Sequence, residues 1–174
     1  MEQLTAIEQA ILNRRSIRRY TPEPVAPELV ERLLQAAMAA PSASNRRPWE
    51  FVVVDDPTLL DGIQQRLLLG RYHPPLAIVV CGNLQRAYPP PGRDFWIEDC
   101  SAAAENILLA ATGLGLGSVW IGVYPIKHFQ RGVSAVLHLP HHVVPLGALY
   151  IGHPAETKPP RTQYDPARVH HNGY

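Results

Sequence analysis

The chain has 174 residues, a length at which a single globular domain with a sizeable core is the usual outcome. Hydrophobic residues make up 46% and charged residues 18%, which excludes a disordered chain, and a net charge of +1 excludes a basic field over the whole molecule for nucleic acid. The N-terminus lacks the basic and apolar segments of a signal peptide, and every apolar run is shorter than the ~20 residues of a membrane helix, so we expect a cytoplasmic protein.

Local patterns in the first half of the chain predict three helices, a loop and a strand. Thr5 and Glu8 form a capping-box pattern, which is typical of a helix N-terminus. Pro27 opens a second helix and Pro41 ends it. The elements expected here are helices over 5–13, 27–40 and 57–69, a loop over 41–48 and a strand over 51–54.

The second half alternates strands with helices. Residues 76–81 are apolar throughout, which favours a strand in a sheet that is covered on both faces. Residues 95–114 form a long helix that is apolar nearly all round, so it is buried in the molecule or in a dimer. The remaining elements expected are strands over 118–123 and 143–151, a helix over 126–137, and a proline-rich, polar tail after Gly152. This mixture predicts an α/β or α+β fold.

A basic segment directly follows the first helix, with the sequence RRSIR over residues 14–18. Its cations could simply complement the helix C-terminus, which explains Arg14 and Arg15 but leaves Ser16 and Arg18 unused. Guanidinium groups around a hydroxyl also suit a phosphate dianion, because each guanidinium offers two parallel donors. Composition leaves both interpretations open.

Two further segments contain residues suited to ligand contact. The loop PSASNRRPWEF over residues 41–51 offers short polar side chains, with Trp49 expected in the core. The segment LGLGSVWIG over residues 114–122 lacks the third glycine of a dinucleotide fingerprint and precedes a strand where the fingerprint follows one. A Rossmann-type NAD site is therefore disfavoured, and the glycines end a helix and allow the backbone to approach a flat ligand.

These segments, taken in order, resemble the nitroreductase family, and the resemblance runs nearly end to end. It rests on four stretches: RRSIRRY, APSASNRRPWEF, WIEDCSAAAENILLAATGLGLGSVWIG, and LPHHVVPLGALYIGHPAE followed by Lys158 and Arg161. The resemblance implies an α+β, three-layer α/β/α fold with a central, mostly antiparallel sheet flanked by helices. It further implies one FMN-binding domain over 1–174, an extended tail over about 153–174, and an intertwined homodimer with FMN at the interface.

The family pattern assigns cofactor contacts to residues of this chain. Arg14 and Ser16, with Arg15 between them, match positions that hold the FMN phosphate and ribityl group. Arg18 matches a cation at the pyrimidine edge of the flavin, where it would stabilise the charge of the reduced ring. Arg161, with Lys158, matches a C-terminal cation on the phosphate. The segment Trp120, Ile121 and Gly122 matches the backbone that passes flavin N5.

The partner chain is implied to supply the loop against the flavin, through Pro41, Ser42, Ala43 and Asn45. Family members often carry Gln where this chain has Arg47, so the Arg47 contact is a departure. The segment between residues 69 and 95 is short, which indicates a reduced cover over the substrate pocket. The activity implied is ping-pong hydride transfer from NADH or NADPH through FMN to a nitroaromatic, a quinone or an enone. No catalytic acid is identified.

The same residues leave other functions open. A flavin-binding storage or sensor protein, or a dehalogenating or flavin-consuming relative, fits the same motifs. A nucleic-acid module on Arg14–Arg19 and Arg46–Arg47 lacks interleaved exposed aromatic residues, so no nucleic-acid or membrane partner is expected. The histidines at 138, 141 and 142 lack metal-ligand spacing, and Cys81 and Cys100 fit small buried residues. Asp99 and Glu105 are interpreted as acidic residues that complement the N-terminal dipole of the long helix.

Overall fold

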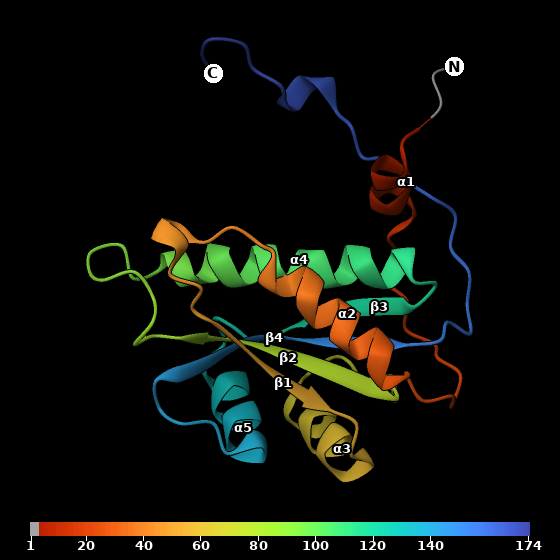
Figure 1. The fold of residues 1–174 in the computed structure, drawn as a ribbon, viewed down its shortest axis with the longest axis vertical. Helices are drawn as coiled ribbons and strands as arrows, with labels where there is room; N and C mark the ends of the chain where they lie inside the picture. The colour runs from red at the N-terminus through yellow and green to blue at the C-terminus, as the bar shows by residue number, and fades with distance from the viewer. Residues whose placement is uncertain (1–3) are drawn as a thin grey trace.

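The structure is a computed structural model, and it describes residues 4–174. Figure 1 shows a sheet between two layers of helices, with both chain ends on the same side of the body. The elements are α1 (Ala6–Asn13), α2 (Pro27–Met38), the 3₁₀ turn η1 (Ala43–Asn45), β1 (Trp49–Val54), α3 (Pro57–Arg66), β2 (Leu76–Asn83), α4 (Phe95–Gly113), β3 (Gly117–Gly122), α5 (Lys127–Leu137), β4 (Val143–Gly152) and the 3₁₀ turn η2 (Pro166–Arg168).

The four strands form one sheet in the order β1-β2-β4-β3, and every neighbouring pair is antiparallel. The two central strands are buried along almost their whole length, which confirms that both faces of the sheet are covered. The expected α+β class with a mostly antiparallel sheet is confirmed. The outer edge of β3 ends the sheet on one side.

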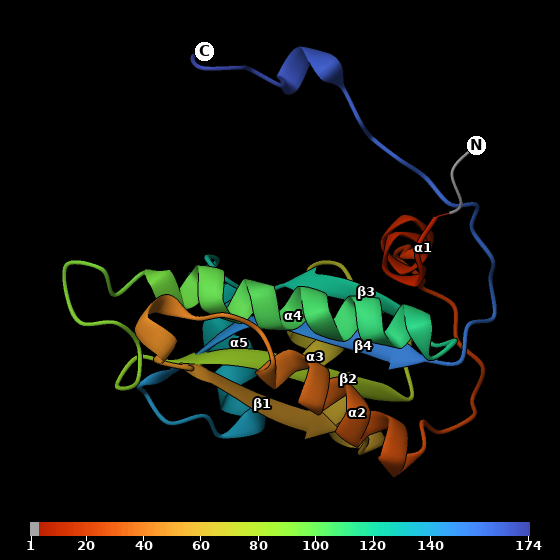
Figure 2. The same ribbon diagram turned by 45° about the horizontal axis from the view of Figure 1, so that its top comes forward.

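Helices cover the two faces in pairs. Figures 1 and 2 show α2 and α4 on one face and α3 and α5 on the other. Successive residues of β2 alternate between the two cores, because side chains of a strand point to opposite faces: Ile78 and Val80 pack under α2 and α4, whereas Ala77 and Val79 pack under α3 and α5. The sheet therefore separates two hydrophobic cores.

The helices begin close to the residues predicted from the sequence, but α3 ends earlier than predicted. The capping box between Thr5 and Glu8 is formed. The expectation that α3 continues to Leu69 is wrong, because the helix ends at Arg66 and Leu67 is extended. Leu67 is buried, but Leu68 and Leu69 are 81% and 71% exposed, so the leucine run is not one helical face. The local pattern could not reveal that the chain must turn here to reach β2.

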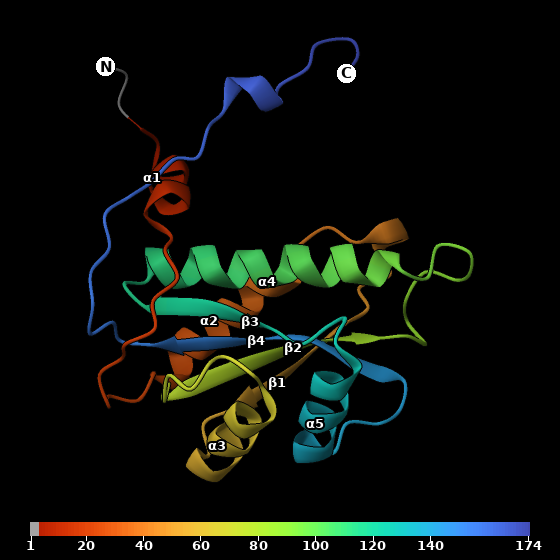
Figure 3. The ribbon, with the colours of Figure 1, turned by 180° about the vertical axis from the view of Figure 1, so that it is seen from behind.

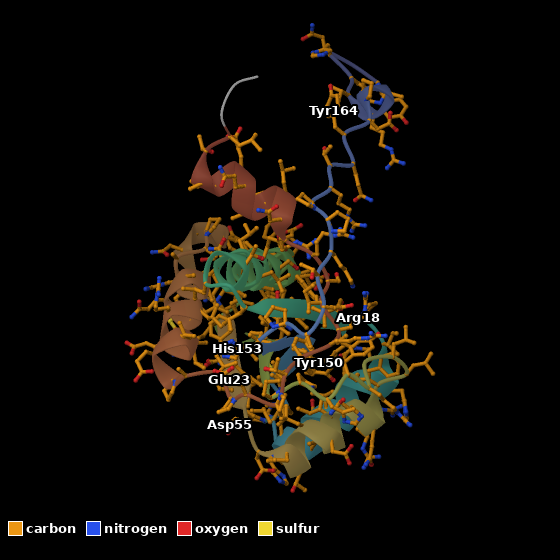
Figure 4. The ribbon with its side chains drawn as sticks, turned by 90° about the vertical axis from the view of Figure 1, so that its right-hand side faces the viewer. Arg18, Glu23, Asp55, Tyr150, His153 and Tyr164 are labelled. Atoms are coloured by element: carbon orange, nitrogen blue, oxygen red, sulfur yellow. The ribbon has the colours of Figure 1, made fainter. Side chains whose placement is uncertain are left out.

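The two chain ends project from the body. Helix α1 has no buried residue, and Ile7 and Ile11 are 73% and 51% exposed. The tail leaves β4, passes α1 and runs on as an extended segment with one 3₁₀ turn; Figure 3 shows it from behind, and Figure 4 places Tyr164 well away from the sheet. Neither end buries its apolar side chains within this chain.

Candidate functional site

The basic segment after α1 lies along the start of β3. Ser16 forms an isolated parallel bridge with Ser118, and the Ile17 N–H donates to the Ser118 carbonyl at 2.9 Å. Gly117 permits this approach, since a Cβ there would stand 2.7 Å from the Ile17 side chain. The hydroxyl of Tyr20 donates to the Ile17 carbonyl at 2.6 Å. These contacts hold the segment against the edge of the sheet.

The C-terminal segment returns to the same place. Lys158 donates from Nζ to the Ser16 carbonyl at 2.6 Å, and Arg15 donates to the Pro159 carbonyl. The Arg161 N–H donates to the Leu12 carbonyl at 3.2 Å, at the end of α1. The structure therefore brings both ends of the chain together, with the backbone of Arg161 against the helical turn that leads into Arg14.

Glu156 joins these two segments through its carboxylate. It accepts from the Arg18 N–H at 2.6 Å and lies 3.3 Å from Lys158 Nζ. The hydrogen bond from Arg18 lowers the pKa of Glu156 below its ordinary value, with a smaller contribution from Lys158. The carboxylate is therefore held in its charged form between the basic segment and the tail.

Glu105 pairs with Arg14 across the α1–α4 contact. The distance from Arg14 Nε to Glu105 Oε1 is 3.6 Å. Burial raises the pKa of Glu105, and the guanidinium of Arg14 opposes that rise. The interpretation of Glu105 as a charge near the N-terminus of α4 is wrong, because it lies in the middle of the helix and its partner is Arg14.

The outer edge of β3 presents backbone groups to open space. The Ser118 carbonyl faces Ile17 and the Val123 N–H faces the Leu146 carbonyl of β4. Since alternate residues of a strand direct their backbone groups to opposite edges, Trp120 and Gly122 face outward with Ser118. Gly122 is exposed, and nothing lies within 4 Å of the position that a Cβ would take. A ligand can approach the backbone there.

The loop over residues 41–47 lies toward the opposite end of α4, as Figure 1 shows. The buried carboxylate of Asp99 accepts from the Ala43 N–H at 2.8 Å, and Ser42 Oγ accepts from the Arg47 N–H at 2.9 Å. Burial raises the pKa of Asp99, and the bond from Ala43 opposes the rise. Asp99 therefore anchors this loop, which corrects its interpretation as a charge that complements the helix dipole.

Within one chain the loop and the basic segment do not meet. Asp99 holds the loop, while Thr112 lies beside Arg15 in a small cavity. These two residues of α4 are separated by about 20 Å along the helix axis at 1.5 Å per residue. Pro41, Ser42, Ala43, Asn45 and Arg47 thus lie in one loop held at Asp99. A second group, at the meeting of the chain ends, consists of Arg14, Arg15, Ser16, Arg18, Lys158 and Arg161. Trp120, Ile121 and Gly122 follow Ser118, the bridge partner of Ser16, along β3.

Comparison with known proteins identifies the family of this chain. The profile of the Nitroreductase family matches residues 11–70 and 67–153 of the chain. The chain belongs to the nitroreductase family. A Methanothermobacter thermautotrophicus protein, provisionally named NADH dehydrogenase/NAD(P)H nitroreductase, is 43% identical over 166 residues, covering 93% of this chain and 84% of the relative.

Solved nitroreductase-family structures have the same fold. A crystal structure from Parabacteroides distasonis, with the same provisional name, has a TM-score of 0.93 at 40% identity and covers 98% of this chain and 100% of the other. An FMN-dependent nitroreductase from Clostridium difficile has a TM-score of 0.87 at 34% identity, covering 95% of this chain and 98% of that one. The nitroreductase-like fold expected from the motifs is confirmed.

In this nitroreductase-family protein, a loop whose role the sequence did not indicate lies beside the basic segment. Gly70 packs against Ile121, with its Cβ position 3.2 Å from the Ile121 side chain, and the Arg18 guanidinium lies 5.8 Å from the centre of the Tyr72 ring. Figure 4 shows Arg18 and Tyr150 on this side of the sheet. No spacing rule connects residue 72 with residue 18. The only local signal is a glycine, Gly70, with an aromatic residue, Tyr72, two positions later in a loop.

The histidines and cysteines singled out from the sequence do not gather into a site. Among residues 4–174 no group of three His, Cys, Asp or Glu side chains could hold a metal ion. His138 ends α5 in the left-handed conformation, with φ of 52°. Cys81 and Cys100 are buried as expected, and burial raises the pKa of both thiols. None of the described helices combines the length and apolar character needed to cross a membrane.

Proposed function

We propose that this nitroreductase-family protein is an FMN-dependent oxidoreductase that uses NADH or NADPH to reduce a small organic acceptor. The observation that carries the proposal is the meeting of both chain ends at the outer edge of β3. Cations from residues 14–18 and from the tail lie there beside outward-facing backbone groups. Bound FMN would take up a hydride from the nicotinamide and release it to the acceptor.

The chemistry of the donor groups fits a phosphate. The Nε atom of Arg15 is buried and has no hydrogen-bond partner among the described residues. The hydroxyl of Ser118 is likewise buried and has no partner there. Buried polar atoms are normally satisfied, so such a pair suits a site that a ligand completes. Arg14, Arg15, Ser16, Lys158 and Arg161 are the residues that would hold the phosphate and ribityl group.

Arg18 and the backbone of β3 are suited to the ring end of the cofactor. The guanidinium of Arg18 is directed by a bond to the Ser16 carbonyl and by the Tyr72 ring. A fixed cation favours negative charge on the pyrimidine portion of a reduced flavin. The outward-facing N–H of Gly122 can donate to the ring without a side chain in the way. Trp120 and Ile121 complete this wall.

A second copy of the chain supplies the other wall in this proposal. Pro41, Ser42, Ala43, Asn45 and Arg47 are far from the basic segment of their own chain, so they would contact the partner's cofactor. Apolar side chains of α1 and the tail are exposed in one chain, and Leu109 of α4 is only half-buried. Burying these surfaces between two chains gives an intertwined homodimer.

Nitroaromatics, quinones and enones are the acceptor classes proposed. The nicotinamide and the acceptor would use the same exposed face in turn, which gives ping-pong kinetics. The connection between β2 and α4 carries no helix over residues 84–94, which supports a reduced cover over the proposed substrate pocket. No side chain is assigned as a proton donor.

An absorbance spectrum of the purified protein tests the proposal, and oxidised flavin bands at one FMN per chain are expected. Arg14→Ala and Arg161→Ala should each weaken FMN binding by about 1.5–3 kcal/mol, because each removes a charge-assisted bond to the phosphate. Arg131→Ala on α5 is the matched control, since its exposed side chain lies outside the site. Unchanged FMN affinity in both site variants would count against the assignments. Colour without steady NAD(P)H oxidation would favour flavin storage or sensing.

A further inference from the structure

The irregular loop between α3 and β2 is attached to three neighbouring elements. The His73 N–H donates to Oε1 of Gln64 at 3.0 Å, and the Gln64 side chain is buried on α3. Gly70 packs against the side chain of a residue of β3. Pro75 packs against β4 so closely that a Cβ at Gly152 would stand 2.7 Å from the proline ring. The residues between these contacts therefore have fixed places.

Tyr72 lies between these attachment points, and its side chain is half-buried. The ring packs against the core under α3 and α5, where Leu67 and Tyr150 are buried. A side chain that rests on a close-packed core and is carried by a fixed backbone keeps one orientation. Tyr72 therefore presents its ring at a fixed position beside the basic segment.

The side chain of Arg18 is held less firmly than its backbone. The Arg18 N–H donates to Glu156 at 2.6 Å, whereas the side chain is exposed to solvent. Among residues 4–174 the guanidinium makes one hydrogen bond, a long one of 3.4 Å from Nη1 to the Ser16 carbonyl, and no ion pair. Its Cζ lies 5.8 Å from the centre of the Tyr72 ring, within the ~6 Å range of a cation–π contact. The Tyr72 ring is therefore the main contact that directs this cation.

We infer that Tyr72 is a positioning residue, which holds the Arg18 guanidinium toward the pyrimidine edge of bound FMN and thereby raises the reduction potential of the flavin. The inference rests on the proposed function, because it requires FMN beside Arg18. Two-electron reduction places negative charge on that edge, and a cation stabilises this charge strongly only while it stays close and out of bulk water. Tyr72 acts through Arg18, so the ring itself need not touch the cofactor.

Removal of the ring from the FMN-loaded protein tests this inference, with a dye-equilibrium titration as the measure of the two-electron potential. Tyr72→Leu and Tyr72→Met each keep an apolar side chain on the core. Both should weaken the preference for reduced over oxidised FMN about threefold, which lowers the potential by about 14 mV. Tyr72→Phe keeps a ring that attracts a cation and should retain the wild-type potential. The FMN content should not change, because the proposed phosphate contacts are untouched.

Two comparisons separate positioning from a general loss of packing. Phe129→Leu on α5 is the matched control, because Phe129 is half-buried against the same core and no cation lies over its ring among residues 4–174. Its potential should equal that of the wild type. Arg18→Gln should lower the potential more than Tyr72→Leu does. Adding Tyr72→Leu to Arg18→Gln should cause no further drop, because the ring acts only through the guanidinium.

A wild-type potential in both Tyr72→Leu and Tyr72→Met, in a protein that holds FMN, would overturn the inference alone. So would a lowered potential in Tyr72→Phe, an equal drop when Arg18 is already replaced, or loss of FMN from the Tyr72 variants. A purified wild-type protein that binds no FMN would instead overturn the proposed function, and this inference with it.

Discussion

The two central strands and the two chain ends of this nitroreductase-family protein differ in how many of their packing neighbours one chain supplies. Strands β2 and β4 have neighbours on both edges and helices on both faces. Helix α1 and the tail touch the body through a few hydrogen bonds and leave apolar side chains exposed. The core therefore forms within one chain, whereas the proposed cofactor site lies where two exposed segments meet and, in the proposed dimer, would be completed by a second copy.

The largest effect is expected from a cavity in the core. Leu149 on β4 is fully buried, so Leu149→Ala should lower the free energy of unfolding by about 2–5 kcal/mol. Leu68→Ala in the exposed loop after α3 removes the same atoms and should have little effect. Urea denaturation of both variants measures the difference. Similar losses in the two would mean that the strands are not the principal source of stability.

A smaller effect is expected from substitutions in α1. They should weaken association of the two chains and leave the stability of the core unchanged. Burial of an isoleucine contributes about 1.5–3 kcal/mol, so Ile7→Ser and Ile11→Ser should each weaken the dimer by up to that amount. Sedimentation over a range of protein concentrations measures the change, and lost dimer should release FMN. Leu59→Ser on α3 is the matched control on the far layer. A dimer that is unchanged by both α1 variants would contradict the proposed role of this helix.

The smallest effect is expected at the junction of the two ends. The pKa of Glu156 is lowered in the folded protein, so its carboxylate stabilises the folded state at a pH above the ordinary pKa near 4.5. This stabilisation is lost as the pH falls through the pKa of the folded state. The protection factor of the Arg18 amide hydrogen, measured by NMR against the intrinsic exchange rate at each pH, should fall below that pH in the wild type. Glu156→Gln should lower the protection factor already at pH 7. Glu23→Gln should leave it unchanged, and equal protection factors in all three proteins would exclude this role of the carboxylate.

Local sequence predicted much of the secondary structure, because its signals act over a few residues. Each successful prediction depended on a feature within one segment. These features are the capping box at Thr5, the proline that opens α2 and the apolar run of β2. The end of α3 was missed because the exposure of Leu68 and Leu69 depends on a turn toward β2. The functions of Asp99 and Glu105 were missed because their partners, Ala43 and Arg14, are distant in sequence.

The sequence by itself therefore determined the elements, the buried apolar strands and, through its motifs, the family to which the chain belongs. Only the tertiary structure decided the strand order, the meeting of Arg15 with Pro159, and the separation of the loop over residues 41–47 from the basic segment. The physical reason is the range of the interactions. Caps and hydrophobic periodicity act between near neighbours. Strand pairing joins residues that are tens of positions apart, and the two chain ends converge through contacts between residues more than a hundred positions apart.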